Sequence, residues 1–168
     1  MEILKFPRSD TISARLQALR LVLPPPLRVP EGVVLPFAPV HVLGKRVLIS
    51  GHGPQHPDGS LAGLAGRIGA ELDEAQGYTA ARLTTLSILA SLERSLGSLD
   101  RVKRWVRVFG MVRCAPGFQR HPNVINGCSD LLLALWGPEL GQHARSAVGM
   151  AELPFGIPVE IEAEAELH

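Results

Sequence analysis

Hydrophobic positions recur with helical spacing in three parts of the chain: residues 9–23, 78–96 and 122–136. Spacings of three and four residues place apolar side chains on one stripe of each predicted helix. Ser9 or Asp10 is the expected N-cap of the first. Gly97 and the Gly137-Pro138 pair follow the second and third, where they should end the helices.

Alternating apolar and polar positions predict strands over residues 40–43, 46–50, 102–113, 144–150 and 158–167, and a further short strand is expected near Arg67-Ile68. Gly44-Lys45 between the first two indicates a tight hairpin. The last strand has the most regular alternation. The side chains that should face the core there are Val159, Ile161, Ala163, Ala165 and Leu167, and glutamates separate them.

In the strand over residues 102–113 both faces carry apolar side chains. Alternation places Val102, Val106, Val108 and Val112 on one face, and Lys103, Trp105, Arg107, Phe109 and Met111 on the other. The order of elements predicts an α+β fold, a mixed sheet with two helices packed on one face. The second face is too apolar to remain in water, so we expect another subunit to cover it.

Proline divides the chain near its start. Residues 1–35 hold the first helix followed by a Pro-rich stretch, which imposes extended backbone, and we interpret them as an N-terminal extension. Residues 36–168 form the main domain, with its compact core from about Phe37 onward. One domain of this size is long enough to bury a core.

Charge and composition exclude several classes of protein. The 17 basic and 16 acidic residues give a net charge of +1, too small to attract nucleic acid or an anionic membrane by a global field. No signal peptide or membrane-spanning segment is visible, so we expect a cytoplasmic protein that needs no membrane. Cys114 and Cys128 cannot form a disulfide framework and should be reduced.

Three local patterns suggest chemistry but have simpler interpretations. Gly51-His52-Gly53 lacks the strand-to-helix context of a nucleotide site. His52 and His56 have the spacing of a metal pair on a helix, yet no helix is predicted there, and turn histidines are the simpler interpretation. The basic and aromatic side chains of residues 101–113 resemble a stacking platform for nucleic acid, although a subunit interface is the favoured use.

The segment over residues 144–162 is the most informative. Arg145 opens one strand and Glu160 opens the next, so a turn can bring a cation and a carboxylate to the same sheet end. Arginine can hold a substrate carboxylate through two hydrogen bonds, and a glutamate can orient or deprotonate a water. A structural Arg–Glu pair is the alternative.

This segment resembles the C-terminal signature of the YjgF/YER057c/UK114 family, also called RidA: Ala-Arg-x-x-Val, Leu-Pro and Val-Glu-Ile-Glu. Further matches occur in the same order. They are Ser50-Gly51 with Pro54 and Asp58-Gly59, residues 66–69, residues 99–102, Phe118 and Asn126. The resemblance covers about residues 36–167.

The resemblance implies a chorismate-mutase-like fold, assembled as a homotrimer with ligand clefts between subunits. It implies a deaminase, a hydrolase acting on C=N bonds that converts 2-imino or enamine acids to keto acids and ammonia. On this pattern Arg145 binds the substrate carboxylate and Glu160 positions or activates water, with Asn126, Phe37 and Ser50 lining the site. Neither a metal nor an organic cofactor is implied, and the partner is a small carboxylate substrate or metabolite.

Two positions depart from the family pattern. Phe37 stands where many deaminases have tyrosine, and Ala147 stands where they often have cysteine. Loss of the tyrosine hydroxyl favours a second hypothesis, a trimer that binds a small carboxylate metabolite without catalysis. A third hypothesis is the L-PSP-like endoribonuclease activity associated with the family name, which would depend on the strand over residues 101–113.

Overall fold

The computed structural model describes residues 11–28, 32, 34–62 and 66–168, and it centres on one five-stranded sheet. The strand order is β1-β2-β5-β3-β4. The strands are β1 (Val40–Leu43), β2 (Arg46–His52), β3 (Val102–Arg113), β4 (Ala144–Met150) and β5 (Val159–Leu167). β4 runs parallel to β3, whereas every other neighbouring pair is antiparallel.

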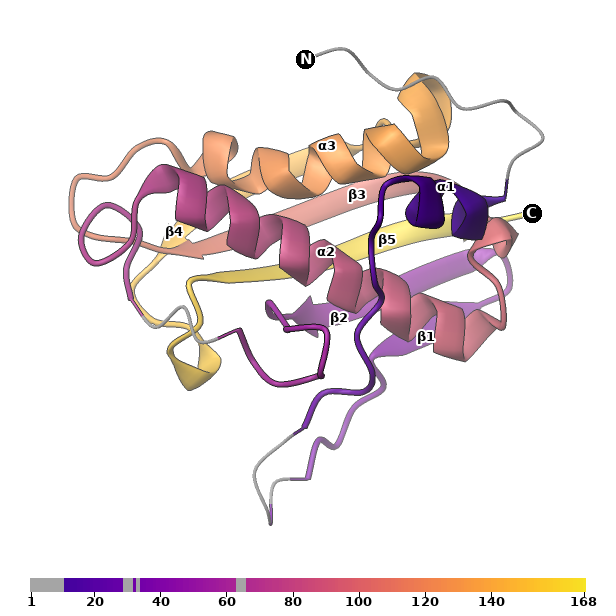
Figure 1. The fold of residues 1–168 in the computed structure, drawn as a ribbon, viewed down its shortest axis with the longest axis horizontal. Coiled ribbons are helices and arrows are strands. Elements are labelled where there is room, and N and C mark those ends of the chain that lie inside the picture. The colour runs from indigo at the N-terminus through magenta and orange to yellow at the C-terminus, as the bar shows by residue number, and fades with distance from the viewer. Residues whose placement is uncertain (1–10, 29–31, 33, 63–65) are drawn as a thin grey trace.

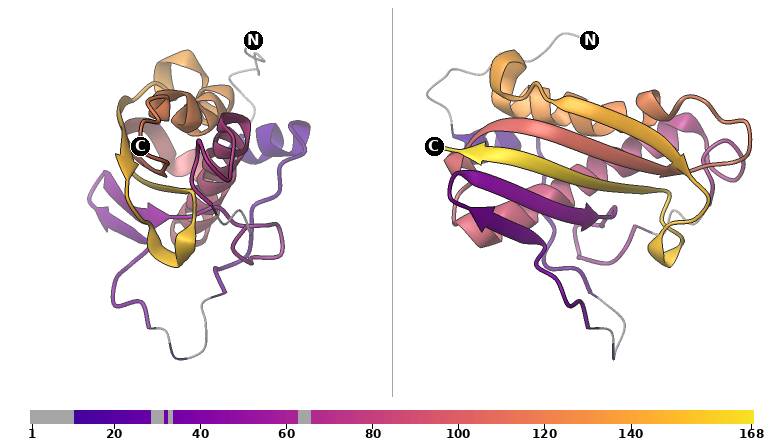
Figure 2. Two further views of the ribbon diagram at one scale, coloured as in Figure 1. Left: turned by 90° about the vertical axis from the view of Figure 1, so that its left-hand side faces the viewer. Right: turned by 180° about the vertical axis from the view of Figure 1, so that it is seen from behind.

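Two long helices, α2 (Glu74–Leu96) and α3 (His121–Leu140), pack side by side on one face of this sheet (Figure 1). Their close approach depends on Gly127, where an added Cβ would lie 2.1 Å from the Tyr78 carbonyl oxygen. Seen from behind, the other face of the sheet carries no helix (Figure 2). The α+β architecture with both helices on one face is therefore confirmed.

The short helix α1 (Ile12–Ala18) shares the core of the main domain. Ile12 and Leu16 are each 5% exposed, so buried packing begins ahead of Phe37. The Ile12 amide donates to Asp100 Oδ1 at 2.8 Å, in the 3-10 turn η1 (Leu99–Arg101), and Arg15 Nη1 donates to the Leu135 carbonyl of α3. These bonds attach the extension to the helix layer.

Helix boundaries differ from the predictions where local capping decides them. The predicted caps Ser9 and Asp10 lie outside the described residues, and Thr11 caps α1 by accepting from the Ala14 amide at 3.1 Å. Asp73 and Gln76 form a capping box that starts α2 ahead of the predicted Tyr78. Gly97 ends α2 in the left-handed conformation, as predicted.

The prediction for the two faces of β3 is wrong at its N-terminal half. Trp105 was expected on the open face but is 2% exposed under the helices, where its ring meets Trp136 edge to face at 5.4 Å. Val106, expected in the core, is 40% exposed. The pairing of β3 with β5 shifts between Val102 and Arg104 and again between Trp105 and Arg107. Such bulges exchange the two faces of a strand.

Candidate functional site

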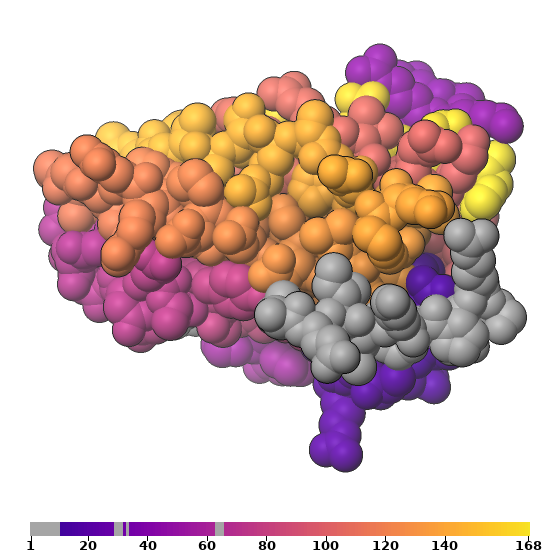
Figure 3. All heavy atoms as spheres, turned by 90° about the horizontal axis from the view of Figure 1, so that it is seen from above, coloured from indigo at the N-terminus to yellow at the C-terminus, as the bar shows by residue number. Residues whose placement is uncertain are grey.

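Arg145 lies on the side of β4 that faces α3, and α3 holds its guanidinium. Nη1 donates to Asn126 Oδ1 at 2.9 Å and to Ser129 Oγ at 3.0 Å, and Nη2 donates to the Pro122 carbonyl at 3.4 Å. Asn126 and Ser129 are three residues apart and therefore share one helix face. Figure 3 shows the atoms of α3 in orange beside the lighter orange of β4 on this side of the molecule.

The partners of Arg145 are neutral oxygens. No carboxylate in the described part of the chain forms an ion pair with it, so the structural Arg–Glu pair is not observed within one protomer. Its Nε makes no hydrogen bond to a described residue, and the edge formed by Nε and Nη2 keeps two donors for a carboxylate. The arrangement is that of a fixed cation prepared for an anion.

Ser129 and His143 belong to this cluster, although sequence analysis did not select them. Ser129 Oγ lies 2.9 Å from His143 Nε2, and His143 Nδ1 lies 2.8 Å from the Gly141 carbonyl oxygen. Spacing offered a signal in both cases. Ser129 follows Asn126 by one helical turn, and His143 precedes Arg145 by two residues, the interval that brings strand side chains to one face.

Glu160 lies at the start of β5 and points toward the helix-free face, because its neighbours Val159 and Ile161 are fully buried beneath the helices. Its carboxyl lies against Gly51 of β2, where an added Cβ would be 2.0 Å from Oε1. Burial raises the pKa of Glu160, and the charge of Glu162 contributes in the same direction. A raised pKa makes the carboxylate a stronger proton acceptor.

Ser50 lies beside Gly51, against which the Glu160 carboxyl packs. Ser50 precedes Gly51, and its Oγ donates to the Ala38 carbonyl at 2.7 Å, which ties β2 to the segment that carries Phe37. Phe37 is 53% exposed. Two of the predicted site residues, Ser50 and Glu160, thus form one group, which we call the glutamate half-site, and Phe37 lies on the segment bonded to it.

Arg145 and Asn126 form a second group, the arginine half-site, on the other side of the sheet. β3 lies between the two strands that carry these groups. Along one edge of β3, Val108 pairs with Arg145 of β4, and along the other edge Met111 pairs with Glu160 of β5. Because successive strand side chains alternate, the buried Val108 marks the helix side, and the half-buried Met111 marks the open side. The expectation that Arg145 and Glu160 converge is therefore not met within one protomer.

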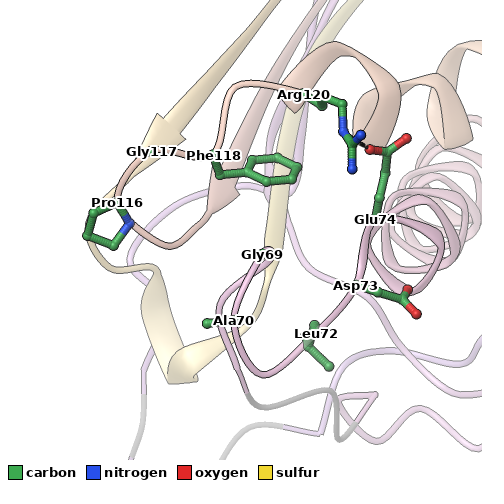
Figure 4. Close-up of a pocket in the computed structure, with 9 residues that line it drawn as sticks. All are labelled: Gly69, Ala70, Leu72, Asp73, Glu74, Pro116, Gly117, Phe118 and Arg120. Atoms are coloured by element: carbon green, nitrogen blue, oxygen red, sulfur yellow. Dashed lines mark ion pairs between the residues drawn. The ribbon is translucent and has the colours of Figure 1, made fainter.

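One cavity of about 550 Å³ contains none of the predicted site residues (Figure 4). Its lining includes Phe118 and three charged side chains: Arg120 and Glu74 form an ion pair with each other, and Asp73 accepts from the Gln76 amide. Asn123 also donates to Glu74, at 3.0 Å. The charges of this cavity thus have partners within the protein.

The proposed stacking platform for nucleic acid loses its central ring, because Trp105 is buried. Lys103 and Arg104 of the same strand both pair with Glu166, and Arg113 pairs with Glu152. These ion pairs neutralise much of the predicted basic stripe. They reduce the positive charge available there for phosphate, although Arg107 lies over Phe109 and has no ion pair with a described carboxylate.

The other candidate residues have structural partners. His52 bonds the Ser50 carbonyl oxygen at 2.7 Å and Ser91 Oγ at 2.8 Å, and burial lowers its pKa. Cys114 and Cys128 are both free, as predicted. In the described part of the chain no helix is long and apolar enough to cross a membrane.

Comparisons with known proteins agree with this fold. Residues 14–159 match the family model described as "YjgF/chorismate mutase-like, putative endoribonuclease". Protein TCP17 of Trypanosoma cruzi is 38% identical over 160 residues, which cover 95% of this chain and 96% of that protein.

Two solved structures are similar over nearly their whole length. One, a protein of unknown function from Agrobacterium tumefaciens, is 36% identical with a TM-score of 0.83, covering 95% of each chain. The other, a "putative endoribonuclease" from Shewanella oneidensis, is 32% identical with a TM-score of 0.84, covering 94% of this chain and all of that one. From the family model and these relatives we conclude that the chain belongs to the YjgF/chorismate-mutase-like family.

Proposed function

We propose that the protein is a 2-imino or enamine acid deaminase that binds its substrate between subunits of a homotrimer. The observation that carries the proposal is the state of Arg145, a cation fixed by neutral oxygens with a donor edge left for a carboxylate. The two free cysteines fit action in the cytoplasm, where thiols stay reduced.

Assembly explains why the two half-sites lie on opposite faces. The helix-free face has partly exposed apolar side chains, including Val106, Phe109 and Met111, that a neighbouring subunit would cover. If β4 of one subunit lies along this face of the next, Arg145 of the first approaches Glu160 of the second. Each complete site then takes its cation and its carboxylate from different chains.

The reaction follows from these two groups. Arg145 holds the carboxylate of R–C(=NH2⁺)–COO⁻, and Glu160 orients a water toward the imine carbon and accepts a proton from it. The C–O bond forms as the C=N π electrons move to nitrogen. Proton transfer to nitrogen and cleavage of the C–N bond then release R–CO–COO⁻ and NH4⁺, so one water is consumed. The imine carbon is already electrophilic, so no stronger nucleophile is required.

Keto-acid release from imino acids, generated in the assay by an amino-acid oxidase, tests the activity. We expect turnover in the wild type and its loss in Arg145→Ala and in Glu160→Gln, each compared at the same oligomeric state. The absence of turnover for every imino acid from an assembled protein would contradict the deaminase proposal. Retained binding of a carboxylate in that case would support the metabolite-binding alternative, which the geometry of Arg145 also fits.

Mixing the two inactive variants tests whether the site is shared. When Arg145→Ala and Glu160→Gln chains are unfolded and refolded together in equal amounts, about a quarter of the sites combine an intact arginine with an intact glutamate from different chains. We therefore expect about a quarter of the wild-type activity to return. Activity that stays at the level of the separate variants would contradict a shared site.

A further inference from the structure

A chain of hydrogen bonds leads from the backbone to the Arg145 guanidinium through two side chains. It runs from the Gly141 carbonyl oxygen to His143, from His143 to Ser129, and from Ser129 to Arg145. The three distances are 2.8, 2.9 and 3.0 Å, all within the normal range for hydrogen bonds. Gly141 lies directly after α3, so the chain begins on fixed backbone.

The chemistry of each group fixes the direction of these bonds. A carbonyl oxygen only accepts, so His143 Nδ1 carries the proton, and Nε2 of the neutral ring is an acceptor. Arg145 Nη1 only donates, so Ser129 Oγ accepts from it. The Ser129 hydroxyl hydrogen must then point to His143 Nε2, and every polar atom in the chain has the partner it needs.

His143 is neutral in this arrangement. Burial lowers its pKa, the Gly141 hydrogen bond opposes that change, and the Arg145 charge lowers the pKa further. Two other charged groups nearby point elsewhere. Asp130 of α3 accepts from the Tyr78 hydroxyl. Arg107 of β3, which pairs with Ala144 of β4, lies over the Phe109 ring on the helix-free face. Arg145 is thus the charged group to which His143 responds.

We propose that His143 is a positioning residue, whose neutral ring orients the Ser129 hydroxyl and thereby holds Arg145 with its Nε–Nη2 edge turned to the substrate carboxylate. The inference rests on the proposed function, because it assigns the purpose of the chain to carboxylate binding. A proton on Nε2 would remove the acceptor. Ser129 Oγ would then face two donors, and its own hydrogen would lose its partner.

The expected pH dependence has a diagnostic sign. A protonated histidine near the site adds positive charge, which by simple attraction would strengthen the binding of an anion. The positioning role predicts the reverse, because protonation disturbs the bond that holds Arg145. We expect the affinity for a carboxylate to fall about tenfold as His143 becomes protonated, the effect of one hydrogen bond to a charged group.

The test is calorimetric binding of pyruvate, a keto acid with an ionised carboxylate, between about pH 5 and pH 8. The proteins compared are the assembled wild type, His143→Phe, His143→Gln and Arg145→Ala, with His41→Gln as a control. His41 is an exposed histidine on β1, at the opposite edge of the sheet. The glutamine amide can accept from Ser129 without titrating, whereas phenylalanine cannot accept.

We expect His143→Phe to bind pyruvate about tenfold more weakly at pH 8. His143→Gln should keep most of the affinity for pyruvate, but this affinity should no longer change with the protonation of residue 143. His41→Gln should show the same pH dependence of pyruvate binding as the wild type. Because titration of Glu160 affects all of these proteins, the difference between wild type and His143→Gln isolates the histidine. Wild-type affinity in His143→Phe, or stronger binding on protonation, would overturn the inference.

The controls separate this inference from the proposed function. If Arg145→Ala abolishes binding but His143→Phe does not change it, the carboxylate site stands and the positioning role fails. If the assembled wild type does not bind pyruvate at any pH, the carboxylate site itself is wrong and the positioning role falls with it. NMR of the His143 ring adds an independent criterion, because the inference requires a proton on Nδ1 and none on Nε2 at pH 8.

Discussion

Substitution of Gly51 by alanine should displace the Glu160 carboxyl and leave the fold intact. The new Cβ would lie 2.0 Å from Oε1 and 2.9 Å from Cδ of Glu160, whereas ordinary van der Waals contact begins near 3.4 Å. The carboxyl must therefore withdraw by at least about 1.4 Å. A displacement of about 1 Å in a catalytic group can reduce turnover about a hundredfold.

The fold should tolerate the change, because the clash involves the end of a flexible side chain. Gly51 is exposed, and alanine costs less conformational entropy than glycine in a strand, by about 0.5–1 kcal/mol. We therefore expect the free energy of unfolding to change by no more than about 1 kcal/mol. Thermal unfolding and the oligomeric state are measured beside activity.

Two assays report on Glu160 directly. Carboxyl NMR should show its pKa moving down toward the ordinary value, since the displaced group loses the burial that raises it. Keto-acid release should fall about a hundredfold. Gly53→Ala is the matched control, because its added Cβ meets the end of the Ile157 side chain at 2.7 Å, and it should stay active. A folded Gly51→Ala protein with wild-type turnover and an unchanged Glu160 pKa would refute this reasoning.

Three further predictions concern stability and thiol chemistry. Because the pKa of Glu160 is raised on folding, its contribution to stability falls as pH rises from about 4.5 through the folded-state pKa. Glu160→Gln should therefore gain stability relative to the wild type as pH rises across that window. The same difference in unfolding free energy between the two proteins at low and at neutral pH would contradict this. Trp105→Ala should lower the free energy of unfolding by about 3–5 kcal/mol in urea titrations, and a smaller loss than in Val106→Ala would contradict its buried position. Burial raises the pKa of Cys128 to about 11, so a thiol reagent at about pH 8 should modify Cys114 first, and equal rates would contradict the difference in burial.

Sequence patterns predicted the strands better than the faces of β3. The alternation in β5 is regular, and its five apolar residues are buried as predicted. In β3, valines and aromatic residues occupy both faces, so alternation looks equally regular with or without a bulge. The two shifts in pairing with β5 depend on contacts across the sheet, which local spacing does not contain.

The candidate site shows a similar limit. The residue types of Arg145 and Glu160 suggested a cation and a carboxylate, and Asn126 does contact Arg145. Their placement on opposite faces of the sheet follows from register, because Arg145 pairs with the buried Val108 and Glu160 with the half-buried Met111. A turn of about eight residues between β4 and β5 suggested adjacent strands, but the connection crosses the C-terminal end of β3, which lies between them.

The position of β5 also determines when the sheet can be completed. It lies between β2 and β3, yet it is the last of the five strands in the sequence. During synthesis β1 and β2 can form a hairpin, and β3 and β4 can pair, but each pair exposes an unpaired edge until residues 159–167 emerge. Exposed edges of this kind favour pairing with other chains. Nascent chains that stop before Val159 should therefore aggregate, since the strand that joins the two halves is made last.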